Sequence, residues 1–446
     1  MLTDSWDAEH PGTPAATGAI GQRASIRTIL HVNEKGGLFG GTEEYIATLT
    51  EHLNRQGVAS HLLYEHAAGG LPPGLASSRR LVGLGERGFR GSLRRPLHRA
   101  LDEIGPDVVY IHNVFSAEVV AALDRVDRRY VVIWYVHDHY LTCLTELRTR
   151  RSDGLRFDCR QPLGEQCLGH VASGGCVRRR PDESVTAADL ATRRQLLDTL
   201  GQADAVIVVS DFMRDVLIDN DPDLADRTFV VPRQIRRPAH RGSTASAPCV
   251  IAYAGRITPE KGLAHALEAL RRTDVDRPVE VRIAGAIEDP RYWAHCQEVI
   301  DELTAEQPAV TVRYLGHLAY DQVDELMGAA HIVVFPSLWA EPLGVVAAEA
   351  VLHGAAVVAN DVGGVRTWFG PGCDDFLVDA NDIGAFAACL SELVADEGRR
   401  RATVQATRSR IAAASTDDAH AAALFDVVRR AQQWRAASAR SGPPPA

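Results

Sequence analysis

Residues 335–364, FPSLWAEPLGVVAAEAVLHGAAVVANDVGG, carry the clearest signature of fold in the chain. They begin where the apolar strand Ile332–Phe335 ends, and a loop then leads into an apolar helix. Pro342 is suited to the first turn of this helix, and Gly354 to its carboxyl end. A second apolar strand follows at residues 356–359. A strand, a helix and a second strand in succession predict a parallel sheet covered by helices.

Two acidic residues stand in this stretch, Glu341 at the mouth of the expected helix and Glu349 further along it. Eight helical residues separate them by roughly 12 Å. This span suits one carboxylate that binds sugar hydroxyls and another that binds a ribose diol, with a diphosphate between them. The N–H groups of Leu343, Gly344 and Val345 would lie at the positive end of the helix, where anions bind. A charge favoured at a helix N-terminus also explains Glu341, but Glu349 among apolar residues needs a partner.

Strand candidates alternate with helices along the chain and form two series, separated by a polar linker at residues 232–248. The expected strands are 26–32, 58–64, 108–112, 130–136 and 205–209 in the first series, and 250–253, 279–284, 310–314, 332–335, 356–359 and 376–378 in the second. Two such series predict an α/β fold of two doubly wound, Rossmann-like domains that face each other across a cleft. Ligands bind such sheets beyond the carboxyl ends of the strands.

We place the first domain at residues 25–236 and the second at residues 249–412. Residues 413–440 are expected to form a C-terminal helix that can cross back to the first domain. The first 24 residues, rich in Pro, Gly and Ala, indicate a disordered leader, and residues 441–446 a frayed tail.

The composition, with 46% hydrophobic and 24% charged residues, is typical of a globular protein. The net charge of -10 argues against nucleic-acid binding, which usually needs a basic stripe. No apolar run approaches the roughly 20 residues that span a bilayer, and the N-terminus lacks a signal-peptide core. We therefore expect a cytoplasmic protein without membrane association. The basic stretch at residues 79–99 indicates either a solvated helix face or a dock for an acidic acceptor or membrane surface.

The pattern of Glu341, seven residues and Glu349, with the glycines that follow, resembles the donor site of family 4 glycosyltransferases, a large retaining group with the GT-B fold. The following pairs are His353-Gly354 and Gly363-Gly364. The resemblance covers roughly residues 26–430. It implies an acceptor-binding first domain and a second domain that binds a nucleotide diphosphate sugar, UDP- or GDP-linked. It also implies that the reaction retains anomeric configuration and needs no metal cofactor for catalysis.

Residues 254–263, AGRITPEKGL, resemble the family's clamp on the donor diphosphate. Arg256 and Lys261 would neutralise the leaving group as charge develops in the transition state. Lysine is rare in this chain: of 48 basic residues only Lys35 and Lys261 are lysines, and both stand in glycine-bearing loops. A compact ammonium that reaches a phosphate would explain them. The resemblance assigns donor binding to Gly40, Gly41, Gly255, Arg256, Lys261, Glu341, Pro342, Leu343, Gly344, Val345 and Glu349.

Two further motifs belong to the first domain. Residues 36–44, GGLFGGTEE, resemble the family's glycine turn, and Glu43 and Lys35 are candidates for the acceptor side, although Lys35 is equally well explained as an exposed lysine. His137, at the end of the strand VVIWYV, resembles the residue that contacts the donor sugar near the reacting centre. It joins the catalytic candidates Arg256, Lys261 and Glu341. Asp138 and His139 are expected to shape the acceptor pocket, or to form a His-Asp acid–base pair.

Two segments depart from the family pattern. Residues 231–235, VPRQI, stand where many relatives carry an Asn-Gly turn, and the loop AIEDP lacks the usual glycine pair. The second departure leaves the identity of the nucleotide base open.

An insert at residues 143–180 contains Cys143, Cys159, Cys167 and Cys176. Four clustered cysteines suit a tetrahedral structural zinc, but CxxC pairs are absent, so free or paired thiols remain an alternative. The insert follows His137 directly and is expected to act as a lid over the acceptor side.

Together these features predict a retaining glycosyltransferase that uses a nucleotide-sugar donor and a small-molecule or glycan acceptor. The arginine-rich composition suggests a GC-rich bacterium, in which natural products are common acceptors. Two alternatives share the architecture: a nucleotide-sugar epimerase and a non-catalytic partner subunit.

Overall fold

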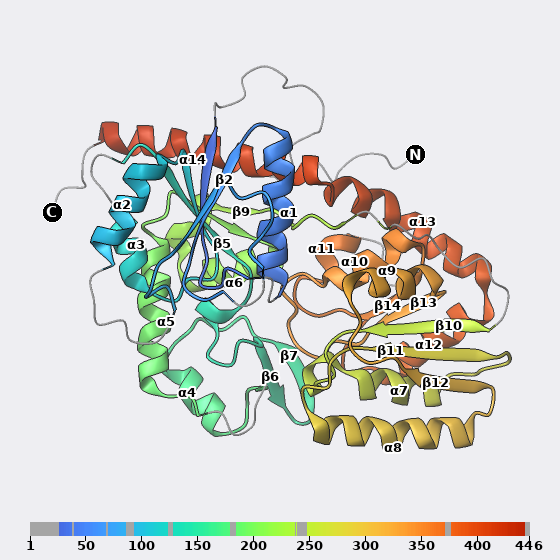
Figure 1. Ribbon diagram of the computed structural model, residues 1–446. Helices are drawn as coiled ribbons and strands as arrows, with labels where there is room; N and C mark the ends of the chain where they lie inside the picture. The colour runs from blue at the N-terminus through green and yellow to red at the C-terminus, as the bar shows by residue number, and fades with distance from the viewer. Residues whose placement is uncertain are drawn as a thin grey trace, which may run out of the picture.

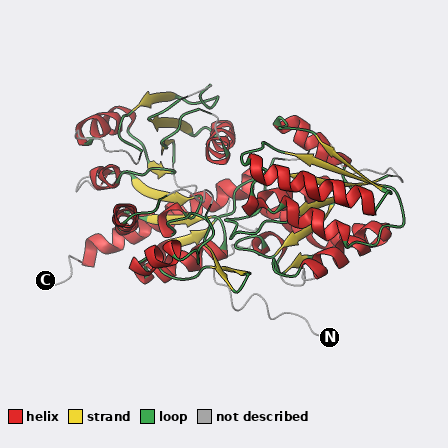
Figure 2. Ribbon diagram, turned by 90° about the horizontal axis from the view of Figure 1, so that it is seen from below, coloured by secondary structure: helices red, strands yellow, loops and turns green. Residues whose placement is uncertain are grey.

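The computed structural model describes residues 26–441 apart from 38–39, 68–69, 86–92, 124–127, 179–183, 237, 239–247 and 371–375. It contains two α/β units that lie side by side (Figure 1). In the view turned by 90°, helices pack on both faces of the sheets (Figure 2). The expected leader at residues 1–24 and residues 442–446 of the expected tail lie outside the described residues.

The first unit is built on a parallel sheet whose strand order is β3-β2-β1-β4-β5-β8-β9. Every residue of the central strands β4, β5 and β8 is buried. The strands are β1 Thr28–Val32, β2 Ala59–Tyr64, β3 Ser77–Arg80, β4 Val108–Ile111, β5 Val131–Val136, β8 Ala205–Val208 and β9 Thr228–Val230. Their helices are α1 Gly41–Arg55, α2 Arg94–Ile104, α3 Ala117–Leu123, α5 Ala187–Leu200 and α6 Asp211–Asn220.

The second unit has a parallel sheet in the order β12-β11-β10-β13-β14-β15. Its strands are β10 Cys249–Ala254, β11 Val279–Ala284, β12 Val310–Tyr314, β13 Ile332–Phe335, β14 Ala356–Asn360 and β15 Leu377–Val378. Its helices are α7 Leu263–Arg271, α8 Pro290–Glu306, α9 Tyr320–Ala329, α10 Val345–His353, α11 Arg366–Phe369, α12 Ile383–Ala395 and α13 Glu397–Ala414. Two parallel, helix-covered sheets confirm the predicted fold class.

The last helix, α14 Asp417–Ser441, returns from the second unit to the first (Figure 1). The hydroxyl of Tyr45 on α1 lies 2.7 Å from Nε2 of His420. Further along, Arg435 donates to the backbone carbonyl of Arg128. The helix therefore joins the end of the chain to the first sheet.

Each expected strand lies within two residues of an observed one, but five further elements were missed. Strand β3, SSRR, is a polar edge strand whose residues are all exposed, so it has no apolar signature. Strand β9 is only three residues long. Within the insert, β6 Thr149–Ser152 and β7 Leu155–Asp158 form an antiparallel hairpin, followed by α4 Glu165–Ala172.

The predicted start of α10 at Pro342 was wrong. The helix begins at Val345, and Gly344 precedes it in the left-handed region with φ of 70°. Residues 341–344 thus form a turn, and the N–H groups of Leu343 and Gly344 do not belong to the first helical turn. The carboxyl end agrees with expectation, because Gly354 adopts φ of 95°.

The loops at the carboxyl edge of the second sheet pack backbone against backbone. A Cβ atom on Gly262 would lie 1.9 Å from the carbonyl oxygen of Pro336, and one on Gly363 would lie 2.3 Å from that of Glu341. Both glycines also have positive φ. Glycine is therefore required where the 254–262, 336–341 and 363–364 loops meet.

We expect Gly262→Ala to destabilise the protein because the new methyl group must displace the backbone at Pro336. The matched control is Gly316→Ala, since Gly316 has a similar φ of 79° but open space around the added atom. The control should lose about 1–2 kcal/mol from backbone strain alone, and Gly262→Ala about 2 kcal/mol more. Urea unfolding measures both, and equal losses would contradict the steric explanation.

Candidate functional site

Glu341 lies at the centre of a compact polar cluster at the carboxyl end of β13. Its Oε1 atom accepts hydrogen bonds from Lys261 Nζ at 2.7 Å, Ser337 Oγ at 2.6 Å and Trp339 Nε1 at 2.7 Å. Glu341 is only 5% exposed. Glu341 is therefore not explained as a charge that is merely favoured at a helix N-terminus. It precedes α10, and its carboxylate accepts hydrogen bonds from side-chain donors.

The two cations of the predicted clamp are both paired with carboxylates. Lys261 ends the short 3₁₀ helix η3 Pro259–Lys261, and its ammonium lies 5.1 Å from the centre of the Trp339 ring. Arg256 pairs with Glu288 at 2.7 Å and with Glu260 at 3.6 Å. The structure therefore brings Lys261 to Glu341, while Arg256 is held by two carboxylates of its own.

Gly255 connects the loop that carries Arg256 and Lys261 to the neighbouring strand. Its N–H donates to the carbonyl of Ala284 at 3.0 Å, and its own carbonyl lies against Gly285. Gly255 thus anchors the clamp loop to the neighbouring strand.

Glu349 is half-buried on α10. Burial raises the pKa of its carboxyl to about 7, while the charge of Arg233 opposes the shift and Glu44 adds to it. Because the pKa is raised, the carboxyl becomes neutral as the pH falls below about 7. Within the described residues, two arginines of the interdomain linker, Arg233 and Arg236, act on Glu349 through their charge alone and form no ion pair with it.

The glycine turn opens helix α1. Gly40 is the N-cap in an extended conformation, and no side chain caps this helix. Gly41 lies beneath an arginine, because a Cβ atom there would be 3.0 Å from Nη1 of Arg233. Glu43 is buried and accepts a hydrogen bond from Asn33 Nδ2 at 2.9 Å. One oxygen of its carboxylate thus contacts the fold, and Lys35 is exposed. A role of either residue on the acceptor side stays a prediction.

Three histidines at the carboxyl ends of adjacent strands form a chain of hydrogen bonds. His31 Nδ1 lies 3.0 Å from His112 Nε2, and His112 Nδ1 lies 3.0 Å from His137 Nε2. Burial lowers the pKa of all three, that of His31 to about 3. The charge of Arg233 lowers the pKa of His137 further. The three rings are consequently neutral at pH 7.

One unpaired atom decides which nitrogen of each of these three histidines carries the ring proton. His31 Nε2 is buried without a hydrogen-bond partner. A buried N–H without an acceptor costs more than a bare lone pair, so the proton of His31 belongs on Nδ1. His112 Nε2 then accepts, its Nδ1–H donates to His137 Nε2, and the proton of His137 lies on Nδ1. His137 therefore offers an N–H donor and is not a base at that atom.

The neighbours of His137 make different contacts from those expected. Asp138 Oδ1 accepts from the backbone N–H of Tyr140 at 2.9 Å. His139 is 1% exposed, and its Nε2 donates to the carbonyl of Ala340 at 2.9 Å. These contacts assign Asp138 to a turn and His139 to the junction of the two units, so neither supports the predicted His-Asp acid–base pair.

The insert crosses from the first unit to the loops around Glu341. Thr149 Oγ1 accepts from the N–H of Ala340 at 2.9 Å. Arg156 donates to the carbonyl of Leu338, and Asp158 accepts from the N–H of Gly363 at 2.5 Å. Burial raises the pKa of Asp158 to about 6. The described contacts thus tie the hairpin to the Glu341 motif, and its role as a lid over the acceptor side stays a prediction.

The four cysteines of the insert line one small cavity and are free thiols. Burial raises the pKa of Cys176 to about 12, and the other three thiols add to this shift. Arg148, 2% exposed, lines the same cavity with Nε and Nη2 unpaired. Among the residues that the structure describes, no three His, Cys, Asp or Glu side chains are arranged to hold a metal. Structural zinc at this cluster therefore stays a prediction.

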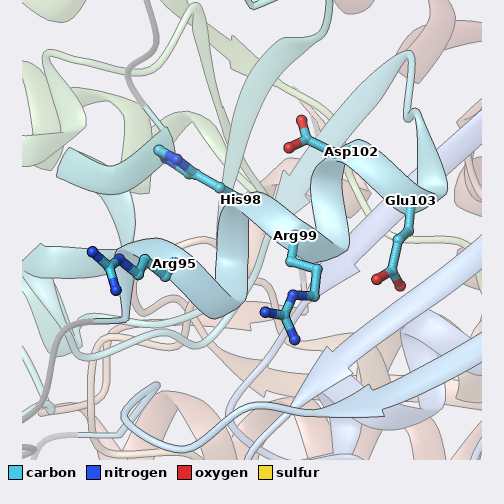
Figure 3. Close-up of a pocket in the computed structure, with 5 residues that line it drawn as sticks. All are labelled: Arg95, His98, Arg99, Asp102 and Glu103. Carbon is cyan, nitrogen blue, oxygen red and sulfur yellow. The ribbon is translucent and has the colours of Figure 1, made fainter.

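A separate hollow lies on the exposed face of α2 (Figure 3). Three basic side chains, Arg95, His98 and Arg99, are followed along it by two acidic ones, Asp102 and Glu103. Glu103 also pairs with Arg79 of β3. This mixture of charges agrees with a solvated helix face rather than a dock for an acidic partner. No helix in the described part of the chain has the length and apolarity to cross a membrane.

The tautomer of His137 can be observed directly by nitrogen NMR of protein labelled at histidine. We expect the His137 ring to give the pattern of a neutral Nδ1–H tautomer throughout pH 6–8, because burial and the Arg233 charge keep its pKa low. The His137→Gln variant assigns the signal. A neutral Nε2–H tautomer would contradict the deduced direction of the chain.

Metal analysis of protein purified without added chelator tests the cysteine cluster. The zinc hypothesis predicts one zinc per chain, held by four thiolates near the positive charge of Arg148, whereas free or paired thiols predict none. Cys159→Ser should abolish zinc retention, whereas Cys296→Ser, a buried cysteine of α8 outside the insert, should retain it. Protein as purified that holds no zinc, and in which all four thiols titrate, would refute the zinc hypothesis.

Comparison with known proteins gives the family. Residues 39–236 match the model of the "Glycosyltransferase Family 4" domain, and residues 238–410 match "Glycosyl transferases group 1". An alpha-maltose-1-phosphate synthase of Mycolicibacterium smegmatis is 37% identical over 229 residues, 47% of this chain and 58% of that protein. A D-inositol 3-phosphate glycosyltransferase of Xylanimonas cellulosilytica is 36% identical over 42% of this chain and 44% of that protein. The chain thus matches about half the length of these relatives.

Solved structures agree over nearly the whole chain. A glycosyltransferase from Rickettsia africae aligns with a TM-score of 0.66 at 15% identity, covering 92% of this chain and 99% of that one. Sucrose-phosphate synthase from Thermosynechococcus elongatus aligns with a TM-score of 0.63 at 19% identity, covering 92% and 100%. At these identities the likeness shows the fold. With both family models placed end to end along it, the chain belongs to family 4 of the glycosyltransferases and has the GT-B fold.

Proposed function

We propose that this protein is a retaining glycosyltransferase that moves a sugar from a nucleoside diphosphate onto a hydroxyl group of an acceptor. The observation that carries the proposal is the cluster of Lys261, Ser337 and Trp339 around the carboxylate of Glu341. It holds a buried anion and a cation at the carboxyl edge of the second sheet, where doubly wound folds bind ligands. Half-buried Glu349 on the following helix extends the same site.

Each group has a role in donor binding. Glu341 accepts hydrogen bonds from hydroxyls of the donor sugar, and Glu349 accepts them from the ribose diol. Lys261 and Arg256 exchange part of their contact with carboxylates for contact with the diphosphate. Because the cations are already in place, little reorganisation is needed as the leaving group gains charge. In this proposal they take the part that a divalent metal plays in other transferases.

The reaction proceeds at the face of the sugar from which the diphosphate departs. The bond between the anomeric carbon and the phosphate oxygen breaks while the acceptor oxygen forms a bond to that carbon. The acceptor proton passes to the departing phosphate oxygen, and the configuration is retained. His137, with its proton on Nδ1, donates a hydrogen bond to the sugar and holds it for attack.

The donor nucleotide is proposed as UDP, with GDP as the alternative. One solved neighbour, HepE from Anabaena, is described in complex with UDP and glucose. The relatives named after maltose-1-phosphate and inositol 3-phosphate suggest small hydroxylated acceptors, and a natural product or glycan fits the same chemistry.

Thermal unfolding with UDP, GDP, ADP and dTDP tests the donor site. We expect one nucleotide to stabilise the wild type by about 2.7 kcal/mol at 100 times its dissociation constant. Glu349→Ala should lose this stabilisation, because the ribose loses its acceptor. Glu325→Ala, which removes an exposed carboxylate of α9, should keep it.

The products separate the proposal from its alternatives. A retaining transferase releases nucleoside diphosphate in step with an acceptor glycoside whose anomeric configuration, read by NMR, matches the donor. An epimerase would convert the donor sugar without an acceptor, and a partner subunit would bind no nucleotide at millimolar concentration. Either result would replace the proposed function.

A further inference from the structure

Arg233 occupies a fixed position between the two units. It lies on the linker that leaves β9 for the second unit, and contacts from the C-terminal helices hold this linker on both sides. His420 Nδ1 donates to the carbonyl of Pro232 at 2.9 Å, and the N–H of Ile235 donates to the carbonyl of Ser415 at 2.9 Å. The backbone at Arg233 is therefore pinned, so its side chain leaves from a defined point.

The guanidinium extends over the glycine turn. Nη1 of Arg233 comes so close to Gly41 that a Cβ atom there would lie 3.0 Å away. The charge of Arg233 acts on the pKa of His137 at the end of β5 and on that of Glu349 across in the second unit. Arg233 thus lies among three elements that the sequence had assigned to donor binding: the glycine turn, His137 and Glu349.

This cation lacks the partners that the other two have. Lys261 pairs with Glu341 at 2.7 Å, and Arg256 pairs with Glu288 at 2.7 Å. Arg233 forms no ion pair with the described residues, and its buried Nε has no hydrogen-bond partner. A partly buried guanidinium without an anion is costly unless a ligand supplies one.

We propose that Arg233 binds the phosphate groups of the nucleoside diphosphate from the first unit, opposite Lys261 and Arg256. The inference rests on the proposed function and adds to it a residue that stands where many relatives carry an Asn-Gly turn. Gly41 has a positioning role, since any larger residue would displace the guanidinium. The uncapped N–H groups at the start of α1 lie beside the same anion. The diphosphate then bridges the units, because cations of both contact it.

Affinities for UDP and for uridine, measured by calorimetry on the full chain, test this inference. Arg233→Gln should weaken UDP binding about 10- to 100-fold, as expected for loss of a charge-assisted hydrogen bond. It should weaken uridine binding much less, through the rise in the pKa of Glu349 that follows loss of the Arg233 charge. Gly41→Ala should also lower the ratio of the affinity for UDP to the affinity for uridine. The control is Arg236→Gln. Arg236 lies on the same linker, and its exposed guanidinium stacks on Tyr320. The ratio of UDP affinity to uridine affinity should stay at the wild-type value in this variant.

The possible outcomes distinguish a failure of the proposed role of Arg233 from a failure of the proposed function. If wild type binds UDP and Arg233→Gln binds it equally well, the role of Arg233 is overturned while the proposed function stands. Equal losses for UDP and uridine would indicate a structural role and would also overturn it. If wild type binds no nucleoside diphosphate among UDP, GDP, ADP and dTDP, the proposed function fails first. Should GDP or another of these bind instead, that diphosphate and its nucleoside replace the uridine pair.

Discussion

The loops at the carboxyl edge of the second sheet depend on one contact, the hydrogen-bonded ion pair of Lys261 with Glu341. A carboxylate that is 5% exposed would be costly if it were left alone. Three donors converge on one of its oxygens: two come from the loop after β13, and Lys261 arrives on the loop after the neighbouring strand β10. The pair is no strong argument for stability, because desolvation of both charges offsets their attraction. Its consequence is positional: an ammonium is held at a defined place before any ligand arrives.

The loop that carries Glu341 is fixed from the other unit as well. The carbonyl of Ala340 accepts from His139 and its N–H donates to Thr149, so one peptide group on each side of this residue is bound to the first unit. Gly363, whose backbone packs against Glu341, donates to Asp158 of the insert. A rotation of one unit against the other would break these bonds. The shape of the Glu341 loop and the separation of the units are therefore coupled.

Sequence reasoning recovered the two sheets, and it singled out candidate residues of the second unit, because these signals are local. Apolar runs mark buried strands, and Glu349 stands out within an apolar helix. The start of α10 was misplaced because Pro342 is equally suited to a turn, and only the φ of Gly344 decides. The histidine chain could not be predicted, since β1, β4 and β5 are distant in sequence and only their order in the sheet brings His31, His112 and His137 together. Arg233 left one signal, the departure of the linker from the family pattern, but its position over Gly41 needed the fold.

Arg233 and the histidines together decide which charges the first unit presents to the cleft. A histidine near neutral pH would normally vary its charge with small changes in pH. Here burial and the nearby guanidinium both lower the pKa of His137, so its ring stays neutral over the physiological range. The first unit thus separates two tasks in the proposed function: Arg233 supplies a positive charge, and His137 supplies a neutral N–H donor. In the proposed complex, a protonated His137 would add a second cation beside Arg233, against the sugar rather than the phosphate. Because the ring of His137 is neutral, the positive charge stays on Arg233, over the glycine turn.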